Sequence, residues 1–278
     1  MTTNAAAMGP GAGMKAPFVR ITNASLHYGE EDESGSLALQ GFDLEIARGE
    51  FVAVVGPSGC GKSTLMKLIS GLTPRSSGHV TVDGVDVVRP LKTVGMAFQN
   101  PALLPWRTVL ENVLLPIQVV RPHRTAFRQD RAPFVARAKA LLAKVGLTGT
   151  EDRFGWQLSG GMQQRVSLCR ALIHEPEILL LDEPFGALDA FTREELWDVL
   201  QTLWIERGFT ILLVTHDLPE AVFLASRVHV LSSRPGRVIY TTDIDLSRPR
   251  QQDAIFTPRF VEYVHDLRAH VSRARQGT

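Results

Sequence analysis

The stretch Gly56-Pro57-Ser58-Gly59-Cys60-Gly61-Lys62-Ser63-Thr64 (GPSGCGKST) decides the fold of this 278-residue chain. It follows the apolar run 51–55 and precedes the amphipathic segment 65–69, which indicates a turn from a buried strand into a helix. The pattern GxxxxGK[ST] in that setting is typical of a loop whose backbone N–H groups surround a phosphate. Lys62 is then expected to reach the β- and γ-phosphates of a nucleotide, and the Ser63 hydroxyl to contact Mg²⁺.

Two more apolar runs, at 178–181 and 211–214, have the character of buried strands. A helix is predicted over 191–204, where apolar residues recur at helical spacing. Continuous apolar strands separated by helices predict an α/β fold with a mainly parallel sheet covered on both faces.

Other regions break this alternation of strands and helices. Polar and apolar residues alternate near 18–48 and 79–88, and Asp83-Gly84 is a hairpin signal, so an antiparallel β subdomain is predicted there. No clear strand occurs from about 101 to 170, which predicts an inserted α-helical subdomain. We expect residues 1–16 to be a disordered tail, 17–245 to form the main domain and 246–278 a C-terminal helical extension with an Arg-rich face. Contact of that face with anionic lipid headgroups is an open alternative.

Acidic and polar side chains follow the predicted strands. Asp182 ends the run 178–181 and is suited to hold Mg²⁺, while Glu183 is suited to deprotonate an attacking water. His216 follows the run 211–214 and is expected to contact the γ-phosphate. Gln99, at the start of the helical region, is a weaker candidate for binding Mg²⁺ or the water.

A second turn suited to an anion occurs at Leu158-Ser159-Gly160-Gly161-Met162-Gln163-Gln164-Arg165 (LSGGMQQR). Ser159 is a good N-cap, and Gly160 and Gly161 leave backbone N–H groups open at the start of a helix. Since one nucleotide has one γ-phosphate, already assigned to Lys62, this turn is best explained if it serves a nucleotide held by a second copy of the chain. An ordinary capped helix is the alternative.

Together these motifs resemble the ABC ATPase family over nearly the whole chain. The resemblance implies a RecA-like P-loop core, ATP and Mg²⁺ as ligands, and a homodimer that encloses ATP. It also implies adenine stacking by Tyr28 and communication between the two sites through residues 186–189, which end in Asp189. Gly186, where Ser is commoner, and Met162, where Gln is common, depart from the pattern without touching a predicted catalytic group.

The segments FQNPALLPWRTVLENV (98–113) and SSRPGRV (232–238) resemble the nitrate/sulfonate/taurine importer ATPases. That resemblance implies integral-membrane permease partners, a periplasmic solute-binding protein, and a peripheral location on the cytoplasmic face of the inner membrane. The transported solute stays open among nitrate, taurine, alkanesulfonates and a thiamine-precursor pyrimidine. The apolar patch Ala102, Leu103, Leu104 and Trp106 is suited to receive a permease helix, or else forms the core of the helical region.

A soluble ABC ATPase acting on DNA or ribosomes is the alternative function. It is disfavoured because the chain has no extended heptads and one phosphate loop. The net charge of +1 gives no reason to expect nucleic-acid binding. Cys60 and Cys169 are not spaced for zinc or a disulfide framework, no signal peptide is expected, and no apolar run approaches the roughly 20 residues that cross a bilayer.

Overall fold

The computed structural model describes residues 17–28, 36–186 and 188–276. The predicted tail, 1–16, lies outside the described residues. Six strands form the larger sheet, in the order β10 (Val238–Asp243), β9 (Arg227–Leu231), β3 (Phe51–Val55), β8 (Thr210–Thr215), β7 (Ile178–Asp182), β6 (Val94–Ala97). All neighbours are parallel except β10, which pairs antiparallel with β9 at one edge.

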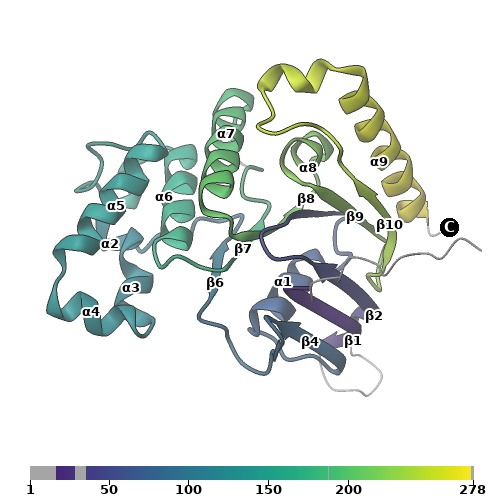
Figure 1. Cartoon of the computed structure of the whole chain (residues 1–278), viewed down its shortest axis with the longest axis horizontal. Helices are drawn as coiled ribbons and strands as arrows, with labels where there is room; N and C mark the ends of the chain where they lie inside the picture. The colour runs from purple at the N-terminus through teal and green to yellow at the C-terminus, as the bar shows by residue number, and fades with distance from the viewer. Residues whose placement is uncertain (1–16, 29–35, 187, 277–278) are drawn as a thin grey trace, which may run out of the picture.

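The smaller sheet is antiparallel, in the order β2 (Ser36–Ile46), β1 (Val19–Tyr28), β4 (Ser77–Val82), β5 (Val85–Asp86). Strands β4 and β5 form a hairpin whose two turn residues, Asp83 and Gly84, both have positive φ (52° and 74°). Asp and Gly tolerate that conformation, which is the reason this dipeptide signals a hairpin. Figure 1 shows α1 (Lys62–Ser70) beside this sheet, below the larger one.

Alternate residues of the central strands enter two hydrophobic cores. Val52 and Val54 of β3 pack with α1 and the smaller sheet, whereas Phe51, Ala53 and Val55 pack with the helices on the other face. Because side chains of a strand alternate between its faces, a strand covered on both sides must be apolar throughout. This explains the unbroken apolar runs, and it confirms the predicted α/β fold with an antiparallel sheet.

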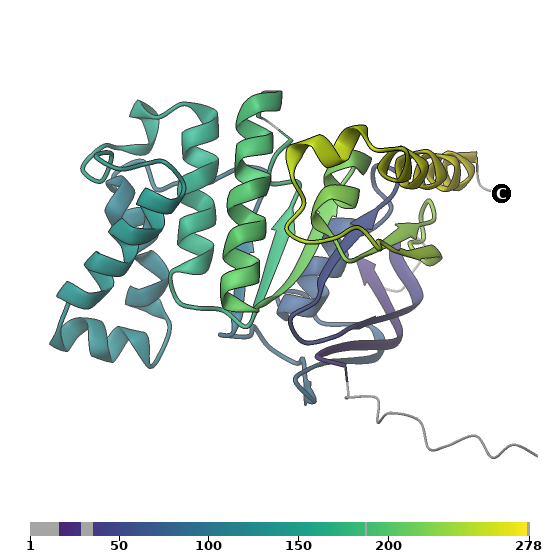
Figure 2. The same ribbon diagram turned by 45° about the horizontal axis from the view of Figure 1, so that its top comes forward.

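Between β6 and β7 the chain is helical, and Figure 2 shows this part at one end of the molecule. Its elements are α2 (Val109–Val113), α3 (Leu115–Val119), α4 (His123–Gln129), α5 (Ala132–Lys144), the 3-10 turn η1 (Gly155–Gln157) and α6 (Gly160–Leu172). The helix expected over 191–204 is α7 (Ala190–Arg207), and α8 (Leu218–Leu224) follows β8. Beyond β10 the chain is irregular as far as η2 (Gln252–Phe256), and α9 (Pro258–Gln276) then runs along α8 and β9.

No helix in the described part of the chain is long and apolar enough to cross a membrane.

Candidate functional site

The phosphate loop lies at the carboxyl end of β3, as its sequence predicts. Gly59 and Gly61 have φ of 76° and 100°, and a Cβ on Gly61 would lie 2.8 Å from the carbonyl oxygen of Ala38. Gly61 also begins α1 without any side-chain cap, so the first N–H groups of the helix are open to an anion. Glycine is therefore required at this position by both conformation and space.

Lys62 is buried inside this loop, with 7% of its surface exposed. Its Nζ donates to the carbonyl oxygens of Gly56 and Pro57, both at 2.9 Å. These bonds hold the ammonium group inside the loop, where we expect it to face a phosphate bound by the backbone N–H groups. Thr64, one turn into the helix, lies 3.3 Å from the Tyr28 hydroxyl, so the predicted adenine-stacking residue borders the loop.

Strand order brings the predicted catalytic groups to the same edge of the sheet. Strand β8 lies between β3 and β7, with Val55 opposite Thr215 and Asp182 opposite Val214. The loop, His216 and the acidic pair therefore follow three adjacent strands. Parallel strands present their carboxyl ends at one edge, where α/β proteins bind ligands.

Asp182 is the residue best suited to hold a metal ion with Ser63. Burial raises the pKa of Asp182 and the charge of Glu183 adds to the rise, while a hydrogen bond from Ser63 and the charge of Lys62 oppose it. A divalent cation would stabilise the ionised carboxylate, and a carboxylate with a hydroxyl is the donor set that Mg²⁺ uses beside phosphate oxygens. The residues present therefore fit Mg²⁺.

Glu183 and His216 contact each other directly. The His216 Nδ1 atom lies 3.0 Å from the Glu183 carboxylate, and the imidazole is 61% exposed. The Glu183 backbone has φ of 45°, in the left-handed region, and its N–H donates to the carbonyl oxygen of Val214 at 2.8 Å. A strained non-glycine residue of this kind needs a structural or functional reason, and here the strain fixes the carboxylate beside the edge of the sheet.

The second turn has its predicted cap. The Ser159 hydroxyl accepts from the backbone N–H of Met162 at 3.3 Å. With Gly160, Gly161 and Asp189 it lines a hollow of about 420 Å³. The Asp189 carboxylate caps α7 by accepting from the N–H of Thr192 at 3.0 Å, which lowers its pKa.

These two parts of the predicted nucleotide site do not meet within one chain. Gly56 and His216 line a different hollow, of about 520 Å³, which shares no lining residue with the hollow at Ser159. The structure thus brings together one group of predicted residues around Lys62 and leaves the Ser159 turn and Asp189 apart from it.

Gln99 is exposed, and its neighbours are held by α6. The Gln164 amide donates to the Phe98 carbonyl oxygen at 3.0 Å, and the Arg170 guanidinium donates to the carbonyl oxygens of Pro101 and Ala102. Sequence reasoning missed this link between the helix of LSGGMQQR and the segment that carries Gln99. No local pattern in the sequence marks this link.

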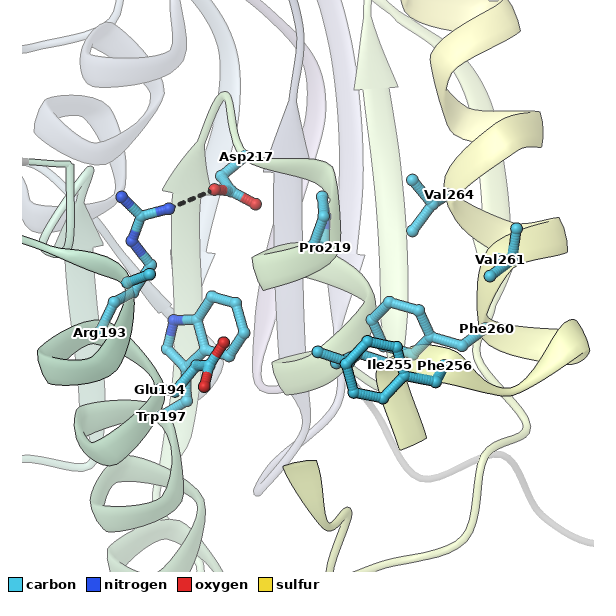
Figure 3. A pocket seen from close by; sticks show the side chains of 11 residues that line it. Arg193, Glu194, Trp197, Asp217, Pro219, Ile255, Phe256, Phe260, Val261 and Val264 are labelled. Atoms are coloured by element: carbon cyan, nitrogen blue, oxygen red, sulfur yellow. Dashed lines mark hydrogen bonds and ion pairs between the residues drawn. The ribbon is translucent and has the colours of Figure 1, made fainter. Parts of the chain in front are cut away.

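Sequence reasoning also missed Arg193. Its guanidinium donates to Asp217 at 2.8 Å and to the Leu188 carbonyl oxygen at 3.1 Å, so it joins the residue before Asp189 to the residue after His216. Figure 3 shows this ion pair between α7 and the start of α8, beside an apolar hollow of about 350 Å³. The signal that could have found it is a basic residue one turn after Asp189.

Gly186 stands where Ser is commoner in the family, and the structure has space for a serine side chain at this position. A Cβ at this position would lie 3.6 Å from the Glu183 carbonyl oxygen and 4.0 Å from the His216 ring, which are ordinary contacts.

Cys60 gives a test of access to the loop. Its thiol is buried and burial raises its pKa, while Cys169 is fully buried with a pKa raised to about 12. We expect a maleimide to modify Cys60 slowly and Cys169 not at all, because the thiolate is the reactive form. Modification should inhibit ATP hydrolysis in proportion to the labelled fraction, and ATP should protect. Cys60→Ala should be insensitive, whereas full activity after confirmed labelling would contradict the expectation.

Glu220 gives a second test, through the dependence of stability on pH. It is 2% exposed, and burial raises its pKa well above the ordinary value, with the charge of Asp217 adding to the rise. The folded chain therefore retains a proton that the unfolded chain loses near pH 4.5, so stability falls as pH rises above that value. Glu220→Gln should remove this loss and raise the melting temperature at pH 8 by about 3 °C or more. The two melting curves should converge near pH 4.5, and a constant difference at every pH would contradict this account.

Comparison with known proteins agrees with the resemblance to ABC ATPases seen in the sequence. The family model described as ABC transporter matches residues 39–186. The taurine import ATP-binding protein TauB of Yersinia pestis bv. Antiqua (strain Antiqua) is 50% identical over 205 residues, covering 74% of this chain and 78% of that protein. TauB of Escherichia coli (strain K12) is 45% identical over 217 residues, covering 78% and 82%.

Two solved structures of the ATP-binding cassette MJ0796 are similar in fold. The dimer described as a bacterial ABC transporter cassette has a TM-score of 0.70 and 32% identity, and covers 82% of this chain and 100% of that one. The dimer described as a post-hydrolysis state bound to ADP and Pi has a TM-score of 0.69 and 31% identity over the same shares.

Proposed function

This chain belongs to the ABC transporter family, and we propose that it is the ATP-hydrolysing subunit of an importer for a small sulfonated solute of the taurine type. The observation that carries the proposal is that the hollow at Gly56 and His216 shares no lining residue with the hollow at the Ser159 turn, so we infer that each chain holds two incomplete halves of a nucleotide site. Two chains arranged head to tail would complete two sites. The dimeric cassettes similar to this chain support that arrangement.

In each completed site, the loop amides and Lys62 bind the β- and γ-phosphates, and the Ser159 turn of the second copy closes over the γ-phosphate. Asp182 and Ser63, with Gln99, would hold Mg²⁺, which supplies neutralisation of phosphate charge when bound. His216 turns Nδ1 toward Glu183, so Nε2 is the ring nitrogen left to reach the γ-phosphate.

Glu183 accepts a proton from the attacking water as the water oxygen bonds to the γ-phosphorus. The bond from that phosphorus to the β–γ bridging oxygen breaks, and ADP and inorganic phosphate are the products. Arg193 bonds to Leu188 and Asp217, which are the neighbours of Asp189 and His216 in the sequence. A movement of Asp189 as the second copy closes would therefore shift His216.

The permease would dock on the segment that Gln164 and Arg170 hold. Trp106 is 71% exposed and Trp156 is 70% exposed, and the bridge between Thr108 and Phe154 places their segments side by side. Leu103 instead packs against the hydrophobic core beside Gly155. Without Leu103, the predicted apolar patch is smaller than the sequence suggested and centres on Trp106. Large exposed aromatic side chains are favoured anchors at protein interfaces.

Co-purification from detergent tests the proposal. Tagged full-length chain, expressed with the adjacent reading frames, should retain a multi-spanning protein, and reconstituted complex should accumulate a sulfonate in an ATP-dependent manner. Trp106→Glu should lose the membrane partner yet hydrolyse ATP as an isolated chain. Ile239→Glu, an exposed apolar position (45%) on β10, is the matched control and should keep the partner. Retention of a ribosome or DNA in place of a membrane protein would refute the import function.

A further inference from the structure

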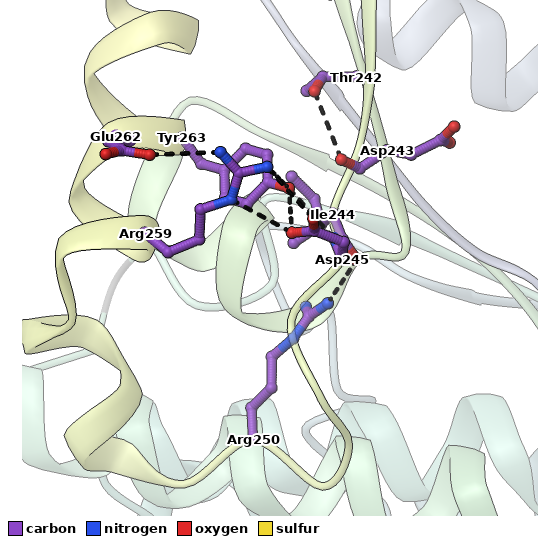
Figure 4. Close-up of polar contacts among 8 residues, drawn as sticks. All are labelled: Thr242, Asp243, Ile244, Asp245, Arg250, Arg259, Glu262 and Tyr263. Carbon is purple, nitrogen blue, oxygen red and sulfur yellow. Dashed lines mark hydrogen bonds and ion pairs between the residues drawn. The ribbon is translucent and has the colours of Figure 1, made fainter.

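The C-terminal helix α9 is held in a fixed register beside the catalytic edge of the sheet. Its Tyr263 hydroxyl and Arg259 guanidinium both donate to Asp245, and the Tyr240 hydroxyl of β10 donates to Asp266 at 2.6 Å. Figure 4 shows the group around Asp245, with Arg250 below it. Phe260 and Leu267 are buried on the inner face of the helix.

Arg250 fixes the segment that leads into α9. The Arg250 residue is 3% exposed, and its guanidinium donates to three carbonyl oxygens at the end of α8, those of Val222, Phe223 and Ala225, at 2.7–2.9 Å. These are carbonyl groups that a helix end leaves without partners, so Arg250 caps α8. The other end of α8 follows His216. Helix α9 is thus tied to α8, the helix that follows the predicted catalytic histidine.

The residues of α9 that line the hollow at His216 are Arg268, Ser272 and Arg275, together with Val264 and Val271. Arg268, Ser272 and Arg275 are spaced by four and three residues, which places them on one face of the helix. They line the hollow of about 520 Å³ together with Gly56 and His216. We call the set Arg268, Ser272 and Arg275 the α9 basic face.

The residues that the structure describes do not balance the charge of this hollow. The carboxylate among the residues that line the hollow is that of Asp217, and it already pairs with Arg193. In residues 17–28, 36–186 and 188–276, no ion pair involves Arg268 or Arg275, whereas Arg259 on another face has both Asp245 and Glu262. Among the described residues, the guanidinium groups of Arg268 and Arg275 therefore face this cavity without an anion of their own, whereas the His216 imidazole contacts the Glu183 carboxylate.

We propose that the α9 basic face binds inorganic phosphate, the product of hydrolysis, as it leaves the γ-phosphate position. This inference rests on the ATPase function above. Gly56 opens the phosphate loop and His216 is the predicted γ-phosphate contact, and both line this hollow, so the hollow adjoins the position that released phosphate would leave. Guanidinium groups match phosphate oxygens in a bidentate manner, and Ser272 can donate a further hydrogen bond. A phospholipid headgroup offers the same chemistry from another source.

Equilibrium binding of inorganic phosphate to the full-length chain, with saturating ADP on the loop, tests the inference. The double variant Arg268→Gln/Arg275→Gln should bind phosphate at least ten-fold more weakly than the natural chain. Arg273→Gln removes a charge from a different, exposed face of α9 and should bind phosphate normally. Equal phosphate binding by the double variant would overturn the proposal, as would loss of binding in Arg273→Gln of the same size.

A parallel measurement separates the two sources of phosphate. Vesicles of phosphatidylglycerol are compared with vesicles of phosphatidylcholine as ligands for the same three chains. Arginine-dependent binding to the anionic vesicles, without arginine-dependent binding of inorganic phosphate, would assign the face to lipid and overturn the product site. Because these measurements need no turnover, failure of the ATPase function would be seen separately, as absence of hydrolysis by the natural chain.

Discussion

Glu183→Gln is expected to reduce steady-state ATP hydrolysis by about 100- to 10,000-fold, the usual contribution of a general base. Glutamine keeps the size of the side chain but cannot accept the proton of the attacking water. Glu183 is only 20% exposed and lies 3.0 Å from His216, so the amide can retain a hydrogen bond to the ring and the fold should be unchanged. The rate of phosphate release checks the loss.

Affinity for ATP should stay within a few-fold of the natural value in Glu183→Gln, because in the proposed site Lys62 and the loop amides, and not Glu183, bind the phosphates. Glu183→Asp is the informative comparison, since it retains a carboxylate but draws it back by one methylene and should keep partial activity. Near-normal turnover by Glu183→Gln would show that another group accepts the proton.

Gly160→Asp should remove hydrolysis by a different route, through the second copy of the chain. A Cβ at Gly160 meets no atom within 4 Å, so there is space for a side chain to begin at this position. An acidic residue at the first position of α6 even favours that helix. In the completed site, however, the carboxylate would face the γ-phosphate held by the other copy. Two unit charges about 4 Å apart repel by about 4 kcal/mol at an effective dielectric constant of 20, or roughly a thousand-fold.

The control for this effect is Gly160→Asn, which has the same shape without the charge. Steady-state hydrolysis and ATP binding by the isolated chain are measured for both variants. We expect Gly160→Asp to lose hydrolysis while its own loop still binds ATP, and Gly160→Asn to keep substantially more activity. Equal loss in both would point to a steric cause within the chain.

The parts of this site that the sequence predicts are those fixed by local chemistry. The glycines of the loop, the Ser159 cap and the Asp83-Gly84 turn depend on neighbouring residues only, and each has the expected geometry. One part of the strand order was predictable, namely that β8 lies next to β7. The acidic pair after β7 and His216 after β8 are both expected to act on one phosphate, so the ends of the two strands must lie close together.

Other contacts depend on segments that meet only after folding. The Gln164 bond to Phe98 spans 66 residues and the Arg250 cap on α8 about 28, and no local pattern marks either one. Leu103 and Trp106 are both apolar and three residues apart, yet one packs against the core and the other faces solvent. Apolar character alone does not separate a core residue from an interface residue.

The masses of Glu183→Gln and of Glu183→Gln/Gly160→Asp, each measured in solution with Mg²⁺ and ATP, test the central claim most directly. That claim is that the Ser159 turn of one copy completes the nucleotide site of the other. The account predicts that Glu183→Gln accumulates as a dimer of twice the chain mass with two ATP molecules, and that adding Gly160→Asp leaves single chains that each still bind ATP. A single ATP-bound chain in both cases, or the same dimer in both, would contradict it.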